Sequence, residues 1–296
     1  MNINILKKKK YLVILLLLNI NLSIFTKPVK ALTPHIYLPK EKTLINTSIK
    51  LGIIASQYIK YGQNKIAISF AKLAIKLNPK ELQLWTILSQ AQLNNNLLDE
   101  AIKSIEEAQK LNPQLEILWR SHASILLQQG KLEKAILSIK KSIKLNDNNS
   151  NSYFLLGNAR LMQKNYSKAL LSFKQASKIN PKFWQAINNE GLVYYELGNK
   201  GKAIKIWRKV LKLESNAEPK LALAIALYSL NTDNTESIAL AKQALEEDPN
   251  YFYIQHQKEQ LWGERLQNDG KKLFRDPKLM STINTTSENT SFTNNQ

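Results

Sequence analysis

Residues 150–183 read SNSYFLLGNARLMQKNYSKALLSFKQASKINPKF, and their spacing of residue types recurs through most of the chain. The alanine at position 169 in this stretch belongs to a column of small residues with one fixed spacing. The column is Ala67, Ala101, Ala135, Ala169 and Ala203, with Ser237 in the sixth place. Proline follows the same period at positions 79, 113, 181 and 249. A fixed period of about 34 residues indicates helix-turn-helix units that bury their apolar sides only against their neighbours.

Six consecutive units account for residues 48–251. They are 48–81, 82–115, 116–149, 150–183, 184–217 and 218–251. In each unit we expect helix A over about the first 14 places and helix B over about places 17–30. The predicted fold is therefore all-α: a right-handed helix-turn-helix solenoid of about six 34-residue units with a C-terminal capping helix.

Small residues recur where the two helices of a unit must approach closely. Place eight of helix A holds Ala55, Ser89, Ala123, Gly157 and Gly191, whereas Ile225 breaks this rule in the sixth unit. The turn between the helices needs a left-handed residue, which Gly and Asn provide most readily. The residues at that place are Gly62, Asn96, Gly130, Lys164, Gly198 and Thr232. Trp85, Trp119 and Trp207 occupy columns that we expect to pack between repeats rather than to bind nucleic acid.

The fourth unit carries the motif that relates these units to a known family. Its residues are Tyr153, Leu156, Gly157, Arg160, Ala169, Phe173, Ala176 and Pro181. Residues 48–251 resemble the tetratricopeptide repeat family, and units two to five match best. Two positions depart from the usual pattern: Arg160 replaces an aromatic residue and His122 replaces a leucine. The resemblance implies that the helices A line a concave groove that binds another protein.

The resemblance also implies which side chains face the ligand, because certain places of helix A commonly do so in this family. Here those places give Thr86, Gln90, Arg120, Ser124, Phe154, Asn158, Asn188 and Tyr195. The alternative is that they are ordinary solvated groove residues. Only Arg120 and Asn158 correspond to the carboxylate clamp of some family members. We therefore expect an internal segment of a protein, extended or helical, or a protein surface as the partner.

The sequence shows no constellation typical of an enzyme or a metal site. His35, His122 and His256 lie in different segments without a partner at ligand spacing. Cysteine is absent, which excludes disulfides and thiolate metal sites. The acidic run 246–248 is interpreted as a solvated face. We expect no catalysis, cofactor or metal, and we expect His122 to be packed in the core, with a pH-sensitive junction as the alternative.

Residues 1–31 carry an export pattern. Lys7 to Lys10 precede an apolar stretch, Tyr11 to Phe25, and Val29 to Ala31 resembles a cleavage site. The stretch is shorter than the roughly 20 residues of a spanning helix. We therefore expect a cleaved signal peptide, with an uncleaved membrane anchor as the alternative; an organelle-targeting peptide or a misread start also remains open. The lysines would place the solenoid on the non-cytoplasmic side, in a periplasm or thylakoid lumen.

The segments around the repeats are predicted as a linker over 32–47, a capping helix region over 252–279 and a disordered tail over 280–296. The helical rhythm of the capping region runs through residues 252–268. The stretch from Glu259 to Leu273 is similar to the ends of cyanobacterial repeat proteins. In that lineage and in plastids, several such proteins assist the assembly of photosynthetic membrane complexes.

The formal net charge is +19, and residues 1–31 contribute six lysines and no acid to it. Such an excess attracts anionic lipid, acidic proteins or nucleic acid, although export argues against the last. AT-rich coding would also explain part of this positive charge.

We predict an exported or membrane-associated adaptor that binds a protein segment in the groove and aids assembly of a membrane complex. In cyanobacteria or plastids that complex would be photosynthetic. The alternatives are a basic module docking on anionic lipid or cell-wall polymer, and an enzyme with an unrecognised site.

Overall fold

The computed structural model describes residues 39–230 and 234–284 of the chain. It divides into two units, Met1–Leu44 and Ile45–Gln296. In the first unit the described residues are 39–44, which contain the start of helix α2. The second unit contains the remainder of α2 and all the repeats, and the descriptions below concern this unit.

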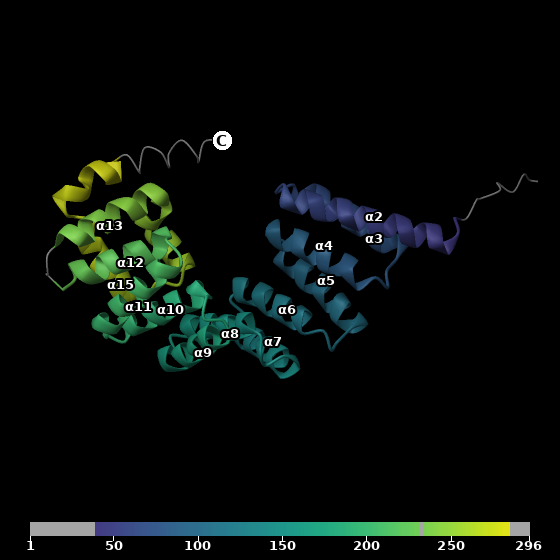
Figure 1. The fold of residues 1–296 in the computed structure, drawn as a ribbon. Coiled ribbons are helices and arrows are strands. Elements are labelled where there is room, and N and C mark those ends of the chain that lie inside the picture. The colour runs from purple at the N-terminus through teal and green to yellow at the C-terminus, as the bar shows by residue number, and fades with distance from the viewer. Residues whose placement is uncertain (1–38, 231–233, 285–296) are drawn as a thin grey trace, which may run out of the picture. The chain divides into compact units, whose positions relative to one another are not determined.

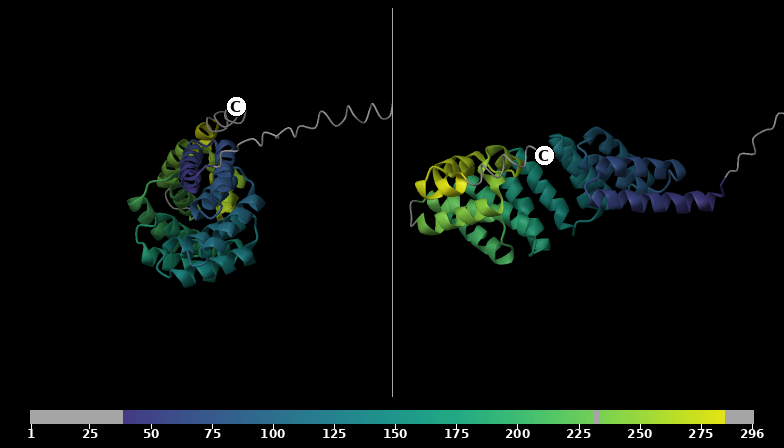
Figure 2. Two further views of the ribbon diagram at one scale, coloured as in Figure 1. Left: turned by 90° about the vertical axis from the view of Figure 1, so that its right-hand side faces the viewer. Right: turned by 90° about the horizontal axis from the view of Figure 1, so that it is seen from above.

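The repeats consist of alternating helices A and B (Figures 1 and 2). The helices A are α2 (Glu41–Lys60), α4 (Leu82–Asn94), α6 (Glu116–Gln128), α8 (Ser150–Met162), α10 (Trp184–Glu196) and α12 (Ala217–Tyr228). The helices B are α3 (Asn64–Leu77), α5 (Leu98–Leu111), α7 (Leu132–Leu145), α9 (Tyr166–Ile179), α11 (Lys200–Leu213) and α13 (Asn234–Glu247). From α3 to α13, every helix packs on the next one along the chain. The predicted all-α solenoid is confirmed.

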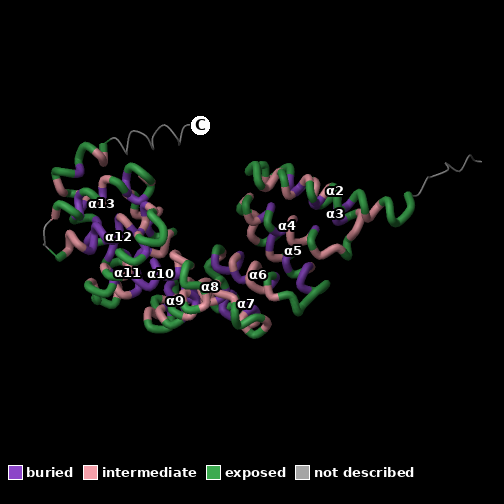
Figure 3. Tube along the Cα trace, viewed as in Figure 1, coloured by how far each residue is buried: buried purple, intermediate pink, exposed green. Residues whose placement is uncertain are grey.

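The alanine column of helix B lies at the centre of each unit. Its members Ala67, Ala101, Ala135, Ala169 and Ala203 are fully buried, as is Ser237 in the sixth place. Figure 3 shows the buried residues gathered along the paired helices. A side chain larger than alanine at these positions would force the two helices apart, so the regular spacing of the column reflects close packing between them.

Place eight of helix A is matched in size to a residue on helix B. A Cβ atom at Gly157 would overlap the Phe173 ring, and one at Gly191 would come within 2.6 Å of Trp207 Nε1. The absence of a side chain at these glycines therefore makes room for a large ring. In the sixth unit the sizes are reversed. Ile225 takes place eight and Ala241 takes the place equivalent to Trp207, and both are fully buried.

The turn between helices A and B has a left-handed residue in each of the first five units, as predicted. The φ angles are 72° at Gly62, 57° at Asn96, 70° at Gly130, 56° at Lys164 and 82° at Gly198. Thr232, the sixth member of the column, lies outside the described residues. Lys164 adopts this conformation despite its Cβ, which costs about 1 kcal/mol relative to glycine.

The turn from helix B into the next helix A is fixed by indole groups in two repeats. Trp85 Nε1 donates a 2.8 Å hydrogen bond to the Pro79 carbonyl, and Trp119 Nε1 donates one of 2.9 Å to the Pro113 carbonyl. Trp207 is fully buried. Trp85 and Trp119 thus join consecutive repeats, as expected, whereas Trp207 packs against Gly191 and Tyr195 within its own repeat.

The first helix begins earlier than predicted. Helix α2 begins at Glu41, so residues 41–47 are helical instead of forming part of a linker over 32–47. Pro39 is the last proline before the helix, and an acidic residue in the first turn suits a helix N-terminus. The predicted signal peptide lies outside the described residues.

The capping region is broken where one helix was expected over residues 252–268. It forms η1 (Pro249–Phe252), α14 (Ile254–Glu259), α15 (Glu264–Leu273) and η2 (Pro277–Leu279). Leu261 has a φ of 61°, which ends α14, and the Glu196 carboxylate accepts the backbone N–H groups of Arg265 and Leu266 at the start of α15. Interactions with a distant helix therefore position the new N-terminus.

The C-terminal segment belongs to the largest hydrophobic core. Trp262, Leu266, Leu273 and Leu279 are buried there together with residues of the fifth and sixth repeats. Residues 280–284, predicted as disordered, are helical, and Ile283 packs against this core. Residues 285–296 lie outside the described part. Among the helices that the structure describes, none has the length and apolar character needed to cross a membrane.

Candidate partner-binding face

A groove of about 840 Å³ lies over the helices A of the first four repeats. We call it the groove. Its apolar lining includes Ile59, Ile87, Leu93, Ile117 and Leu155. Its polar and charged lining includes Ser56, Lys60, Thr86, Gln90, Arg120, Ser121 and Ser124. The surface therefore combines an apolar floor with hydrogen-bonding groups and two cations.

Five of the eight side chains predicted to face a partner line this groove. They are Thr86, Gln90, Arg120, Ser124 and Phe154. Two of them already have local hydrogen-bond partners: Thr86 Oγ1 donates to the Gln83 carbonyl at 2.8 Å, and Gln90 Nε2 donates to Asn94 Oδ1 at 2.7 Å. The structure thus brings these residues together, with Thr86 and Gln90 partly paired on their own helix and, within the described part of the chain, the terminal nitrogens of Arg120 left available to a partner.

Arg120 is held in place by a buried carboxylate network. Its Nε donates to Glu116 Oε1 at 3.3 Å, and the two side chains are 26% and 13% exposed. The hydroxyls of Ser142 and Ser152 donate to the same oxygen at 2.6 and 3.0 Å, and Asn149 Nδ2 donates to Oε2 at 3.1 Å. Because these donors come from α7 and the start of the next repeat, Glu116 ties two repeats together and fixes the guanidinium at the groove.

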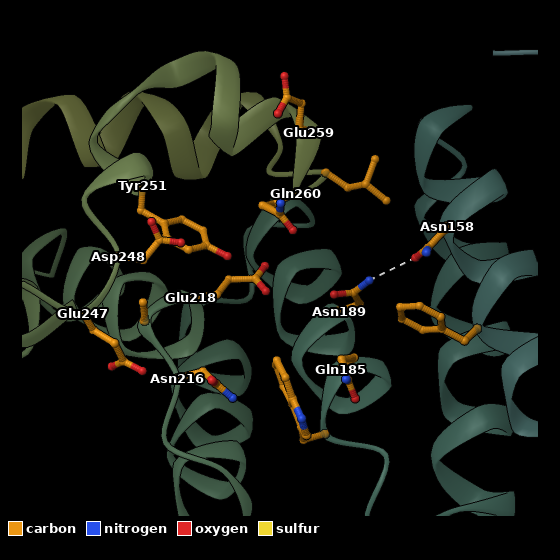
Figure 4. Close-up of a pocket in the computed structure, with 14 residues that line it drawn as sticks. Asn158, Gln185, Asn189, Asn216, Glu218, Glu247, Asp248, Tyr251, Glu259 and Gln260 are labelled. Carbon is orange, nitrogen blue, oxygen red and sulfur yellow. Dashed lines mark hydrogen bonds between the residues drawn. The ribbon is translucent and has the colours of Figure 1, made fainter. Parts of the chain in front are cut away.

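Asn158 lies in a second pocket, of about 500 Å³, which we call the acidic pocket (Figure 4). Asn189 Nδ2 donates to Asn158 Oδ1 at 3.0 Å, so the amide predicted to bind a peptide already pairs with the following repeat. Phe154 lines both the acidic pocket and the groove. The remaining amides and carboxylates in the lining are Gln185, Asn189, Asn216, Glu218, Glu247, Asp248, Glu259 and Gln260.

The carboxylates of the acidic pocket were not recognised as a group from the sequence. Glu247 and Asp248 belong to the run interpreted as a solvated face, but Glu247 pairs with Lys220 at 2.6 Å and Asp248 caps η1. Glu218 accepts a 3.1 Å hydrogen bond from Trp262 Nε1. Burial raises the pKa of Glu218 to about 7, although the hydrogen bonds from Trp262 and Asn188 oppose this shift.

Asn188 and Tyr195, the two other predicted partner-facing residues, are fully buried. This corrects the sequence-based expectation for their position. Helix α15 packs on α10 and α12, and the Tyr195 hydroxyl donates to Asp269 Oδ2 on α15 at 2.7 Å. The repeat period carries no information on where the C-terminal helix docks, so the sequence could not show that α15 covers Tyr195. Asn188 instead donates a hydrogen bond to Glu218 at the start of α12.

Asp269 is the polar centre of that covered region. Lys200 Nζ donates to Oδ2 at 2.9 Å and Lys272 Nζ donates to Oδ1 at 2.8 Å. Burial alone would raise the pKa of Asp269, but the hydrogen bonds from Lys272, Lys200 and Tyr195 outweigh it and lower the pKa to about 2. The Asp269 carboxylate therefore stays charged and hydrogen-bonded where α15 meets α10 at ordinary pH.

Comparison with known proteins gives the family. Models described as tetratricopeptide repeat match residues 82–115 and 119–149, residues 150–183 and residues 188–252. The chain belongs to the tetratricopeptide repeat family. No curated protein matches this tetratricopeptide repeat chain.

Solved structures share the fold of this tetratricopeptide repeat protein at low sequence identity. A structure titled as a functional characterization of Pseudomonas aeruginosa pilF has a TM-score of 0.61 at 17% identity, covering 75% of this chain and 100% of that one. PilW, titled a widely conserved type IV pilus biogenesis factor, has a TM-score of 0.60 at 17% identity, covering 75% and 97%. A MamA structure has a TM-score of 0.50 at 22% identity, covering 57% and 92%. These similarities establish the fold.

His122, which departs from the tetratricopeptide pattern, is packed as predicted. Its side chain is 14% exposed, and Nδ1 lies 3.2 Å from Ser138 Oγ. Burial lowers its pKa, and Glu106, whose Oε1 is 3.9 Å from Nε2, partly opposes this. Across the residues described, no group of three or more metal-ligating side chains is suitably placed for an ion.

Proposed function

We propose that this tetratricopeptide repeat protein is a non-catalytic interaction scaffold that binds a segment of another protein in the groove over α4, α6 and α8. The observation that carries this proposal is the apolar lining of a groove of about 840 Å³. Ile117 on α6 lines it and is 46% exposed. An apolar surface bordered by polar groups marks an interaction site, because covering it removes apolar area from water.

The exposed part of the groove lining lies outside the buried columns that hold the repeats together, although buried side chains such as Leu118 and Ile125 form its base. Stability comes from the buried alanine column and from pairs such as Gly157 with Phe173. Ile117 takes no part in these columns. Its substitution should therefore affect binding far more than folding, which makes the proposal testable by mutation.

The test compares two exposed apolar positions on neighbouring helices. Ile117→Glu places a charge in the groove, whereas Leu137→Glu places one on α7, where Leu137 is 68% exposed. Full-length tagged proteins would be crosslinked in cells of the source, purified and analysed by quantitative mass spectrometry, with circular dichroism to verify folding. We expect a protein set that wild type and Leu137→Glu recover equally and Ile117→Glu recovers about tenfold less, a loss of about 1.4 kcal/mol. Equal recovery by all three would exclude the groove as the binding site.

We also propose that the solenoid acts on the non-cytoplasmic side of a membrane, in a periplasm or thylakoid lumen. The support is the basic and apolar pattern within residues 7–31. Protease protection in sealed cells or vesicles tests the location, and N-terminal sequencing tests cleavage after Ala31. Digestion of the solenoid from the cytoplasmic side would contradict the proposal.

The finer proposal is that the bound partner is a subunit of a membrane complex whose assembly the scaffold assists, photosynthetic if the source is cyanobacterial or plastid-like. The similarity over Glu259 to Leu273 supports it. Native gels of membranes from cells carrying Ile117→Glu should show less of one assembled complex. An unchanged pattern of complexes would remove this proposal without affecting partner binding.

The net charge of +19 favours a second candidate, docking on anionic lipid or cell-wall polymer. Co-sedimentation of the protein with phosphatidylglycerol vesicles at low and high salt tests docking on anionic lipid. Charge-driven docking would be strong at low salt and lost at high salt. Absence of sedimentation at low salt would exclude the lipid surface.

A further inference from the structure

We infer that the segment bound in the groove is an amphipathic α-helix with an acidic edge. This inference rests on the proposed function and specifies its ligand. It follows from four features: the helix that the chain itself places on the helices A of the last repeats, the hydrogen bonding of the groove, the apolar surface next to it and the distribution of charge.

Helix α15 shows how a helix fits on this face. It packs on α10 and α12, and its Leu266 and Leu273 side chains are 1% and 0% exposed. Gly270 lies between them, and a Cβ there would come within 3.0 Å of Ile225 Cδ1. Positions 266, 270 and 273 have the i, i+4, i+7 spacing of an amphipathic helix held in a groove. The same face, formed by helices A in the first four repeats, is the floor of the groove.

The hydrogen bonding of the groove favours a helix over an extended segment. Its floor consists of helices, whose backbone groups are paired internally. Thr86 and Gln90, two of its polar side chains, already bond to their own helix. An extended segment lying on this floor would have only a few side chains, such as Ser121 and Ser124, to pair with its backbone N–H and C=O groups. Each backbone group buried without a partner would cost about 1–3 kcal/mol. A helix satisfies its own backbone and presents only side chains to the floor.

Exposed apolar side chains continue beyond the groove toward the N-terminal end of the repeats. An adjoining pocket of about 460 Å³ is lined by Ile49 and Ile53 of α2 and shares Ile87 with the groove. Ile49 is 45% exposed and Ile53 is 55% exposed. Together with Ile117 these side chains offer apolar contacts on α2, α4 and α6. An apolar stripe on the bound helix would cover them.

The charges of the face predict the edge of the bound helix. Lys60 and Arg120 line the groove, whose described lining includes no carboxylate, and the adjoining pocket adds one, Glu81. Glu116 engages Nε of Arg120, and the two terminal guanidinium nitrogens have no hydrogen bond among the described residues. A carboxylate on the ligand would therefore find a fork of free donors.

The acidic pocket limits where such a helix lies. It begins at Phe154 and Asn158 and is lined by Glu218, Glu247 and Asp248. Glu247 is paired with Lys220, but an acidic edge extending into this pocket would still meet the carboxylates of Asp248 and Glu259, which opposes binding there. The charge change along the helices A thus confines the ligand to the first four repeats.

Three synthetic peptides of about 18 residues, five helical turns, would serve as probes. All carry the same leucine stripe; the first has glutamate along its edges, the second has lysine there, and the third is the glutamate peptide with a central proline. Fluorescence anisotropy measures their binding to the full chain. We expect the glutamate peptide to bind at least about tenfold more tightly than either of the others. The double variant Lys60→Gln, Arg120→Gln should lose the preference for glutamate over lysine, and Leu137→Glu should retain it.

Equal binding of the proline peptide would show an extended mode, and equal or tighter binding of the lysine peptide would exclude the acidic edge. Failure of all three to bind would also overturn the inference. The capture experiment with Ile117→Glu separates this failure from that of the proposed function. If Ile117→Glu loses a partner while no probe binds, partner binding in the groove is supported and the inference that the ligand is a helix is rejected. If capture does not depend on Ile117, the proposed function fails whichever probe binds.

Discussion

The Tyr195 hydroxyl donates a 2.7 Å hydrogen bond to Asp269, although the two residues are 74 positions apart in the chain. Tyr195 belongs to helix A of the fifth repeat and Asp269 to α15. The bond therefore joins the face expected to bind partners to the C-terminal segment of the same chain. Because α15 packs on α10 and α12, the open groove lies over the first four repeats, and the Tyr195–Asp269 bond offers a direct test of how α15 is held.

Replacing Tyr195 with phenylalanine should loosen α15. The change removes one hydrogen bond to a buried carboxylate and should cost about 1.5–3 kcal/mol. Hydrogen exchange should show faster exchange of amides in α15, with those of α4 and α6 unchanged. Tyr58→Phe in α2 is a matched control, because the Tyr58 ring stacks on Phe70 at 5.5 Å in another part of the solenoid. Unchanged exchange in α15 would mean that this bond does not hold the helix.

Gly157→Ala should destabilise the fourth repeat by about 1–3 kcal/mol, because the added methyl group overlaps the Phe173 ring. The third repeat has Ala123 and Ile139 at the equivalent places. The double variant Gly157→Ala, Phe173→Ile should therefore recover part of the loss. Chemical denaturation of the four proteins in this cycle gives the coupling energy. Additive effects would show that the two positions are not matched in size.

Lys164→Gly should stabilise the protein by about 0.5–1 kcal/mol, because glycine adopts a positive φ without the clash of a Cβ. The lost ion pair with Glu264 joins two exposed side chains and contributes little. Asn96→Gly should have a smaller effect, since asparagine tolerates this conformation. Thermal melting compares the three proteins, and a lower Tm for Lys164→Gly would show that the ion pair outweighs the backbone strain.

Glu218→Gln should raise Tm at alkaline pH. Burial raises the pKa of Glu218 to about 7 in the folded state, above its ordinary value of 4.5. A carboxyl with a raised folded pKa stabilises the fold fully below its unfolded pKa and loses this contribution as pH rises through about 7. Glutamine stays neutral, so its Tm should exceed that of wild type by roughly 7–14 °C at pH 9 and differ little at pH 4. A difference independent of pH would contradict this assignment.

The architecture could be predicted from the sequence because each repeat packs on its neighbours in the same way. The alanine column is needed for close packing within a repeat, and Gly62, Gly130 and Gly198 are needed for the left-handed turn. Both requirements recur in successive repeats and are therefore visible in the sequence. In the sixth repeat the large residue, Ile225, is on helix A and the small one, Ala241, is on helix B. This reversal is also local, but it can be interpreted only once the two positions are known to be in contact.

The candidate site could be predicted only in part. Five of the eight expected partner-facing residues lie together in the groove, since their places on helix A repeat with the fold. Tyr195 does not, because α15 returns over the fifth and sixth repeats and contacts it through Asp269, and Asn188 does not, because it is buried beside Glu218 of α12. Such a contact between distant segments has no period. Glu218 and Glu259 likewise line one acidic pocket because the C-terminal segment returns over the last repeats.

A photocrosslinking amino acid at position 117 tests the central claim most directly. It would be incorporated into the full chain in cells of the source, with the same amino acid at position 137 as a control on the outer helix. Binding in the groove predicts a specific crosslinked peptide of one partner at position 117 and none at position 137. The same crosslinks at both positions, or none at position 117 while the partner is still captured, would contradict binding in the groove.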